Sequence, residues 1–410
     1  MIYSIKKSII KVFFVMSGIA LFHLANTFIL ARSLSMGQMG LFRIVLTVGE
    51  FIFVVSLLGI DASFIRFFSR YSPSLYRWKR YVCMAIGLSA LLACGLVLIA
   101  GKFYEFTPLV VSAVVIAVVL SITNRAFNSF LRAQKYFGQA TFLERSSVLV
   151  FFGLLIILFA VKKLTFNSAL FSYLFAAAVA VFWIIRISTR KIKSGKKALP
   201  SSIFKEGLIF FGILVTITIM LNANQLFIAK MVSYESLAVY TVTLSIMRVF
   251  ELAVNALYYV FVPSLNNDKP IETGKIFAFL VTIGLLIGSF YFVAGKSMIH
   301  FLFQGKYDQG AELIPFFVGI GICRMLYIFP ASIAGGRASK KSLRRFFYAN
   351  CLAAIFGIIL NYFFILRMGI KGAALATMYT WMLAAIFSCL AVKKELFSGV
   401  VGRLKTEHDK

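Results

Sequence analysis

Residues 81–101 read YVCMAIGLSALLACGLVLIAG, a run without a single charged side chain. The hydrocarbon core of a bilayer is roughly 30 Å thick, and a helix needs about 20 apolar residues to cross it. The run therefore predicts a transmembrane helix. A second apolar run begins at residue 108, so the chain is expected to turn and cross the bilayer again.

Comparable runs fill almost the whole chain, which is 61% hydrophobic. A soluble protein of this length would not be so apolar. The sequence therefore predicts an all-α polytopic membrane protein with twelve transmembrane helices. They are expected at 9–31, 41–60, 81–101, 108–131, 140–161, 166–187, 206–230, 237–263, 275–295, 311–334, 346–366 and 370–392.

Basic residues gather in every second gap between these spans. Roughly three-quarters of the 43 Lys and Arg residues fall on the side of the N-terminus, and cytoplasmic loops carry the Lys/Arg excess in membrane proteins. Both termini are therefore expected in the cytoplasm. The same rule, with attraction to anionic lipid head groups, explains the net charge of +29. Nucleic acid is not an expected partner, because the charge is spread over short loops.

The sequence contains no signature of an enzyme or of a metal centre. The gaps between spans are too short to fold as a separate catalytic domain, and no nucleotide-binding loop or HExxH motif occurs. No cofactor is expected. The cysteines fall within spans without the spacing of a metal site, and are interpreted as small packing residues: Cys83, Cys94, Cys323, Cys351 and Cys389.

The two halves of the chain resemble each other. Residues 26–35 read NTFILARSLS, and 198 positions later residues 224–233 read NQLFIAKMVS. A looser match pairs RAQK at 132–135 with RASK at 337–340. This pattern predicts two six-helix bundles, residues 1–197 and 198–410, related as a parallel internal repeat about an axis along the membrane normal. In such transporters the substrate path lies between the halves.

Several charged residues fall inside the predicted spans or at their ends, where a charge costs about 2.5–3.5 kcal/mol on insertion scales. Such residues persist where they face a cavity or a partner. The expected substrate-binding residues are Arg248, Arg324, Arg125, Arg43 and Lys230. The expected coupling or gating residues are Glu50, Glu251 and Asp61.

The spacing of these residues suggests how they pair. Arg248 and Glu251 are three positions apart, so they share one face of a helix. Glu50 is the repeat equivalent of Arg248, which predicts that the two meet across a central cavity, as a static brace or as a gate. Arg324 has no acidic residue within one turn, so it is expected to line a water-filled cavity.

Two carboxylates at the cytoplasmic helix ends are expected to pair locally, Asp61 with Arg66 and Glu144 with Arg145. His23 lies in the middle of the first span. It titrates near neutral pH when exposed, but a packed, hydrogen-bonded histidine is the favoured interpretation.

Five short motifs carry a resemblance to a known family. They are ARSLSMGQMGLF at 31–42, LRAQK at 131–135, AVY at 238–240, GKY at 305–307 and GIKGAALAT at 369–377. With the twelve spans and two halves, they resemble the multidrug/oligosaccharidyl-lipid/polysaccharide (MOP) exporter superfamily, and most of all its Wzx-type polysaccharide flippases.

The resemblance implies a bacterial inner-membrane protein with two six-helix bundles around a cationic cavity. It also implies flipping of an isoprenoid-pyrophosphate-linked oligosaccharide, such as an O-antigen or capsule repeat unit, by alternating access. Membrane lipids, and the polysaccharide polymerase machinery, are the expected partners. Because no ATP-binding motif is present, transport is expected to draw on a gradient, with H⁺ or Na⁺ as candidate coupling ions.

Two other functions remain open from the sequence. A multidrug exporter of the same superfamily would favour an acidic cavity for organic cations, against which the excess of intramembrane arginine argues. A polysaccharide polymerase or ligase needs a reactive loop outside the membrane, and no predicted outside loop is long.

The charge pattern predicts that residues 101–107 and 294–310 face outside and 186–205 face the cytoplasm. Single cysteines introduced on a cysteine-free background should therefore react with an impermeant maleimide from outside at the first two segments and not at Gly195. Labelling of position 195 in intact cells would reverse the assignment.

Overall fold

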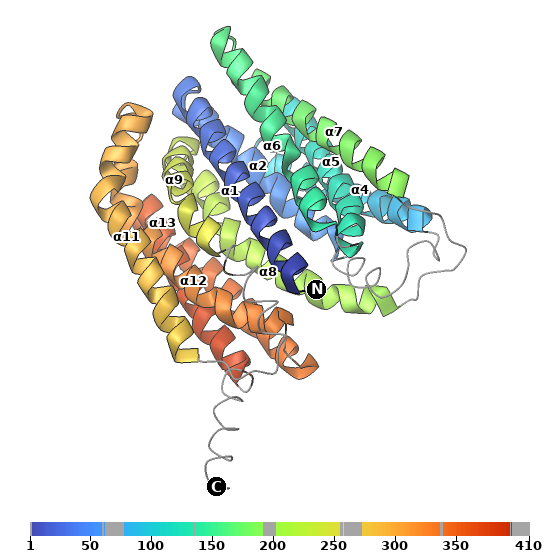
Figure 1. Cartoon of the computed structure of the whole chain (residues 1–410). Helices are drawn as coiled ribbons and strands as arrows, with labels where there is room; N and C mark the ends of the chain where they lie inside the picture. Colours follow the sequence, from blue (N-terminus) through green and yellow to red (C-terminus); the bar gives the residue numbers. More distant parts are fainter. Residues whose placement is uncertain are drawn as a thin grey trace. The chain divides into compact units, whose positions relative to one another are not determined.

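The computed structural model describes residues 2–59, 61, 78–134, 136–191, 202–254, 257, 273–336, 339–393 and 395, and nearly all of them are helical (Figure 1). The chain divides into two compact units. Unit 1 is Met1–Thr218 with Ser233–Ala238, and unit 2 is Ile219–Val232 with Val239–Lys410. The boundary predicted after residue 197 falls in 192–201, outside the described residues, and stays a prediction.

Among its described residues, unit 1 contains six long helices, the first part of a seventh and, at Ser233–Ala238, the start of the helix that follows. They are α1 (Ile2–Ser33), α2 (Met36–Leu57), α4 (Trp78–Phe103), α5 (Pro108–Ala133), α6 (Phe137–Ala160), α7 (Phe166–Lys191) and α8 (Ser202–Met231) as far as Thr218. Ser35 begins α2 with a capping box. Its hydroxyl accepts from the Gln38 amide at 3.2 Å, and the Gln38 side chain accepts from the Ser35 amide at 3.3 Å, which satisfies two amides that the helix leaves open.

Unit 2 holds the rest of α8 and the helices that follow it. These are α9 (Tyr234–Ile246) from Val239 on, α11 (Thr273–Phe303), the 3₁₀ helix η2 (Asp308–Leu313), α12 (Ile314–Gly336) and α13 (Lys340–Ala391). Gly369 interrupts α13 with φ 57° and ψ −133°. A side chain would strain this left-handed backbone. The interruption falls where one predicted span ends, at 366, and the next begins, at 370.

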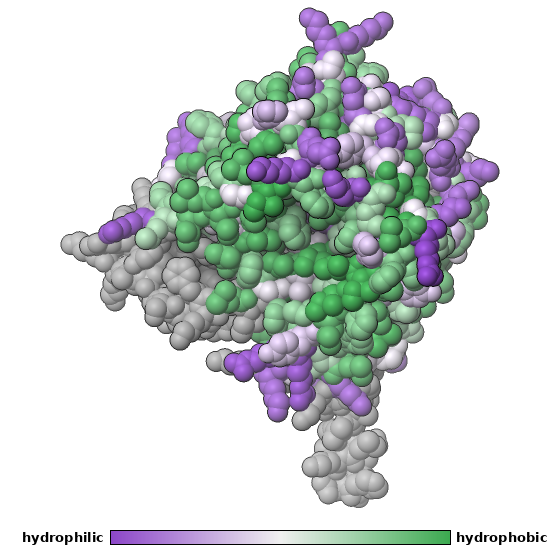
Figure 2. All heavy atoms as spheres, turned by 180° about the vertical axis from the view of Figure 1, so that it is seen from behind, coloured by the Kyte–Doolittle hydropathy of each residue, from purple (hydrophilic) through white to green (hydrophobic). Residues whose placement is uncertain are grey.

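Among the described residues, nine helices are long and apolar enough to cross a membrane, or ten if the bent pair Tyr234–Ile246 and Arg248–Val254 is one span. The structure thus confirms a polytopic, nearly all-helical protein, whereas the total of twelve spans and the two-bundle repeat stay predictions. On the face seen in Figure 2, hydrophobic residues cover much of the described surface, and the hydrophilic residues lie mainly in its upper part and near its lower end.

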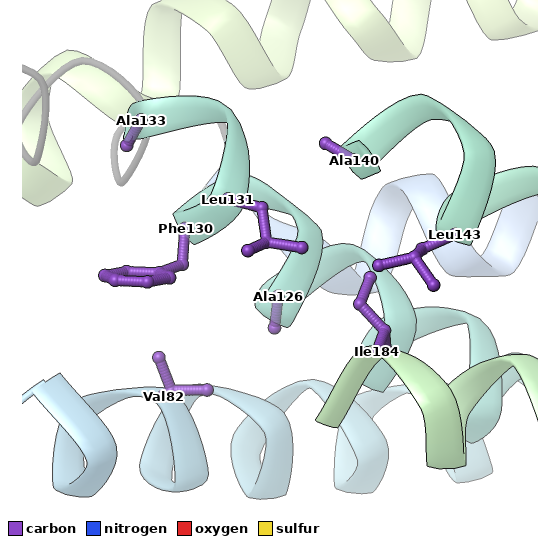
Figure 3. Packing of buried hydrophobic residues seen from close by; sticks show 8 residues of the cluster. All are labelled: Val82, Ala126, Phe130, Leu131, Ala133, Ala140, Leu143 and Ile184. Atoms are coloured by element: carbon purple, nitrogen blue, oxygen red, sulfur yellow. The ribbon is translucent and has the colours of Figure 1, made fainter. Parts of the chain in front are cut away.

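Four helices of unit 1 meet in a dry core (Figure 3). Its members come from α4, α5, α6 and α7: Val82, Ala126, Phe130, Leu131, Ala133, Ala140, Leu143 and Ile184. Asn128 of α5 is fully buried beside them, and its amide donates to the carbonyl of Ala140 in α6 at 2.6 Å. Small residues let these helices approach closely, and the amide bond fixes their register.

The expected span at 237–263 is not one straight helix, and part of it lies outside the described residues. The helix α9 ends at Ile246, and Arg248–Val254 continues at an angle of 51°. At the break the Met247 amide bonds to Leu244 and the Phe250 amide to Met247, both at 3.1 Å, three residues back instead of four. The tighter turn redirects the chain, and the Phe250 ring lies against Gly321 of α12, where a Cβ atom would collide with it.

The matched segments at 26–42 and 224–240 have the same local structure. In both, a helix ends, a serine follows, and the serine oxygen accepts from an amide three residues on, Gln38 for Ser35 and Ser236 for Ser233. Within unit 1 the starts of these two helices touch, because Gly40 of α2 lies directly against the backbone carbonyl of Tyr234. Only a residue without a side chain fits there.

We expect Gly40→Ala to destabilise unit 1 by about 1–3 kcal/mol, the usual penalty of overpacking, because its Cβ would overlap the Tyr234 carbonyl. The thermal unfolding midpoint of the purified protein in detergent should fall. Gly49→Ala is the matched control on α2, since its Cβ would meet Val118 at an ordinary 3.8 Å. Equal midpoints for the two variants would contradict the close contact.

Candidate functional site

Unit 1 encloses a polar cavity of about 400 Å³ between α1, α2, α5, α6 and α7. Helices that cross a bilayer rarely place charged groups together unless the groups face such a space. The charged and polar side chains around it are His23, Arg43, Glu50, Ser121, Asn124, Arg125, Glu144, Arg145, Ser147 and Tyr173. The cavity therefore brings together three residues predicted from the sequence: Arg43, Glu50 and Arg125.

Arg43 and Glu50 reach the cavity because they are seven residues, or about two turns, apart on α2. Opposite them, Tyr173 of α7 lies edge-on to Phe42 and Phe151, with ring centroids 6.4 and 5.8 Å away. Among the described residues no ion-pair partner is found for Glu50, which is exposed. The cavity thus holds a carboxylate open to water within a predominantly apolar bundle.

Arg125 occupies the centre of an ion-pair network at one wall of the cavity. Its Nε donates to Asp61 Oδ2 at 2.8 Å, and its Nη1 donates to Glu144 Oε1 at 2.7 Å. The second oxygen of Glu144 accepts a hydrogen bond from Arg132, which lies about two turns after Arg125 on α5. Two carboxylates from different segments therefore hold one guanidinium fork.

This network adds distant partners to the local pairs expected from the sequence. Glu144 pairs with Arg125 and Arg132 of α5, and Asp61 pairs with Arg125, 64 positions away. Arg66 lies outside the described residues, so the pairing of Asp61 with Arg66 stays a prediction. The distant partners were not expected, because the residues that meet here are far apart in the sequence and adjacent in space.

The network is buried enough to matter for stability. The side chain of Asp61 is 3% exposed, that of Glu144 18% and that of Arg125 25%. An ion pair this deep stabilises little relative to apolar packing, but loss of one partner leaves a charge without compensation. Arg125 is therefore tied to the wall of the cavity, and its role in substrate binding stays a prediction.

A second cluster lies in unit 2. Arg324 of α12 donates from Nη1 to Glu251 Oε1 at 3.2 Å, and its guanidinium lies 5.3 Å from the centroid of the Trp381 ring in α13. Trp381 packs edge-on against Tyr327 at 5.3 Å, and the hydroxyl of Tyr327 donates to Asn350 at 2.8 Å. This chain of contacts sets the position of the guanidinium.

The cluster revises one expectation. The sequence offered Arg324 no acidic neighbour within one turn, but the bend after Ile246 brings Glu251 to it from another helix. Glu251 thus pairs with Arg324, and its expected pairing with Arg248 stays a prediction.

Arg248 itself is half-buried in the bent segment, and Lys230 is exposed in the last turn of α8. The pairing of Glu50 with Arg248 would join units 1 and 2 and stays a prediction.

The sequence analysis missed several residues of the cavity. His23, Asn124 and Tyr173 also line it, although a packed role was favoured for His23 and the other two residues were not singled out. The spacing of His23 could have indicated its position. His23 lies three residues before Asn26, so the two share one face of α1, and the amide of Asn26 donates to the Val148 carbonyl on α6 at 3.2 Å. Within the described residues, no group of three or more His, Cys, Asp and Glu could hold a metal ion.

Comparison with known proteins identifies the fold. No family model matches the chain, and no curated protein matches it in sequence. Several solved structures match over nearly their whole lengths. One is the lipid II flippase MurJ in an inward closed conformation, with a TM-score of 0.68, 16% identity, and coverage of 95% of this chain and 90% of that one.

Two further matches are MATE transporters, one of which is described as a multidrug resistance transporter. An inward-facing MATE transporter of the MOP superfamily gives a TM-score of 0.61 at 14% identity, covering 93% of this chain and 95% of the other. A MATE transporter from Vibrio cholerae gives 0.63 at 14% identity, covering 97% and 98%. The chain therefore has the fold of these transporters, as the resemblance of its motifs predicts, and the identities are too low to carry over a substrate.

We expect Arg125→Met to lower the stability of the protein by about 3–5 kcal/mol, because the buried Asp61 would lose its partner and Glu144 would keep only Arg132 of its two ion pairs. Thermal unfolding in detergent measures the loss. Arg145→Met is the matched control, since Arg145 lines the same cavity but is exposed.

Neutralising the partners as well, in the variant Arg125→Met/Asp61→Asn/Glu144→Gln, should recover part of the lost stability. If the triple variant unfolds earlier than the single one, the penalty does not come from unpaired carboxylates. If it regains stability without regaining transport, Arg125 has a second role in the cavity.

Proposed function

We propose that this protein moves an isoprenoid-pyrophosphate-linked oligosaccharide across the bacterial inner membrane by alternating access. The observation that carries the proposal is a charged cavity lined by Arg43, Arg125 and Arg145 inside a bundle of apolar helices. The fold supports it, because a lipid II flippase has the same architecture. Both termini are proposed to face the cytoplasm.

The chemistry of the head group fits guanidinium ligands. A pyrophosphate carries several negative charges that must pass the hydrocarbon region, and arginine replaces lost hydration with short, often bidentate, hydrogen bonds. Arg43 and Arg145 supply two such groups in the cavity, beside the Asp61–Arg125–Glu144 network. The isoprenoid tail remains in the bilayer while the head group enters the cavity.

Arg324 is the proposed phosphate ligand of unit 2. Among the described residues its carboxylate partner is Glu251, which is 39% exposed, and the contact is 3.2 Å long. A phosphate oxygen competes for the same guanidinium edge, while the Trp381 ring holds the other side of the fork. Release of Glu251, with uptake of H⁺ or Na⁺ by that carboxylate, would couple transport to an ion gradient.

A multidrug exporter is the second candidate, because MATE transporters share the fold with TM-scores of 0.61 and 0.63. Glu50 is the specific observation in its favour, since an exposed carboxylate in the cavity would attract an organic cation. The surrounding arginines oppose that attraction. A polymerase is a weaker alternative, and the polymerase machinery is proposed as a partner in the membrane.

We expect Arg324→Ala to abolish translocation of a fluorescent polyprenyl-pyrophosphate-linked sugar in proteoliposomes, and Arg324→Lys to retain part of it, because lysine keeps the charge and loses the fork. Lys371→Ala is the matched control, since Lys371 forms a solvent-exposed ion pair with Glu312 in the same unit.

Wild-type translocation by Arg324→Ala would exclude Arg324 as a phosphate ligand. Failure of the unaltered protein to move the labelled lipid, together with proton-driven uptake of ethidium, would identify an exporter of cationic drugs.

A further inference from the structure

A second, apolar groove runs between α6 and α7 on the outside of unit 1. Its volume is about 590 Å³. The main lining residues are Phe142, Leu149 and Val150 from α6 and Val179, Trp183 and Ile187 from α7. Phe142 and Trp183 form its rim and are 47% and 48% exposed. The groove therefore opens on the outer surface of the helix bundle.

The floor of the groove is fixed, because Leu143 also belongs to the dry core of unit 1, next to Ile184 (Figure 3). The groove is also separate from the charged cavity. Glu144, Arg145 and Ser147 of α6 line the cavity, whereas Phe142, Ser146 and Leu149 line the groove. One face of α6 thus lines the charged cavity and another face lines the apolar groove.

One end of the groove is basic and polar. Arg186 and Arg190 follow Trp183 and Ile187 at a spacing of three, so they extend the groove-lining face of α7 towards its C-terminal end. Both are exposed, and among the described residues neither side chain has an ion-pair partner.

The start of α6 lies at the same end. Gln139 lines the groove there, and α6 begins after Tyr136 without a side-chain cap. Amides at a helix start favour an anion. An apolar groove with an anion-attracting end matches a lipid with a negatively charged head group.

We propose that the α6–α7 groove binds an anionic phospholipid, with one acyl chain along the groove and its phosphate at Arg186 and Arg190. The charge pattern places this end of α7 on the cytoplasmic side, where basic residues near the surface attract anionic lipid. The isoprenoid tail of a transported substrate is a poorer occupant, because its head group enters the cavity on the other face of α6.

Quenching of Trp183 fluorescence tests the proposal directly. The chain has three tryptophans, so Trp78→Phe/Trp381→Phe leaves Trp183 as the only reporter in the full-length protein. The variant is reconstituted in phosphatidylcholine vesicles with increasing fractions of phosphatidylglycerol brominated on its acyl chains, or of brominated phosphatidylcholine. Bromine quenches at contact, so the two curves report which lipid occupies the groove.

We expect brominated phosphatidylglycerol to be preferred by about fivefold per arginine, the affinity equivalent of one basic residue near an anionic surface. Arg186→Gln/Arg190→Gln should remove the preference. Lys162→Gln/Lys163→Gln is the matched control and should keep it, because it removes two exposed charges at the opposite end of the same helix pair. Ser146→Phe, which fills the groove from α6, should independently reduce quenching by the anionic lipid.

Equal quenching by the two lipids, or a preference that survives in Arg186→Gln/Arg190→Gln, would overturn the proposal. Displacement of brominated phosphatidylglycerol by a smaller fraction of polyprenyl phosphate would also overturn it and assign the groove to the isoprenoid. The result is independent of translocation, so the groove can hold its lipid even if the proposed transport function fails.

Discussion

The constraint on which this structure depends is that a charged or polar group inside a bilayer must find its partner within the protein. For the backbone, the α-helix satisfies the requirement along each segment, which is why nearly every described residue is helical. For side chains, the partners must come from other helices. Arg125 shows this most clearly, because its two carboxylates belong to separate segments. The same requirement that raises the cost of intramembrane charge also ties the helices of unit 1 together.

The helices themselves were accessible from the sequence, and the ion pairs were not. Hydropathy shows how long each segment stays apolar, and the thickness of the membrane sets that length. The helix bounds could therefore be predicted: the expected span at 108–131 lies within α5 (Pro108–Ala133). Pairing depends on how helices pack. Arg324 lies 73 positions from Glu251, and no local pattern connects them. The sequence thus indicated Arg43, Glu50 and Arg125, which line the cavity, and could not say which charged residues meet.

Two interruptions of helices differ in whether the sequence alone could predict them. Gly369 stands between two predicted spans, and its left-handed backbone is a property that only glycine adopts easily, so the residue itself signals the break. The bend after Ile246 has no glycine or proline. It arises from a change in hydrogen bonding at Met247 and from the fit of Phe250 against Gly321 on another helix. A tertiary cause of this kind leaves no trace in a local window of sequence, yet it brings Glu251 to Arg324.

The two arginine clusters differ in a way that bears on transport. Arg125 is held by two carboxylates that are 3% and 18% exposed, with contacts of 2.8 and 2.7 Å, so a phosphate would have to displace well-buried partners. Arg324 has one longer contact to a carboxylate that is 39% exposed, and an aromatic ring keeps its guanidinium in position when that contact is broken. Water can solvate Glu251 as it leaves, which lowers the cost of exchanging it for another anion. The arrangement around Arg324 suits a site that must bind and release a charged head group in each cycle. The arrangement around Arg125 suits a wall that must stay intact through the cycle.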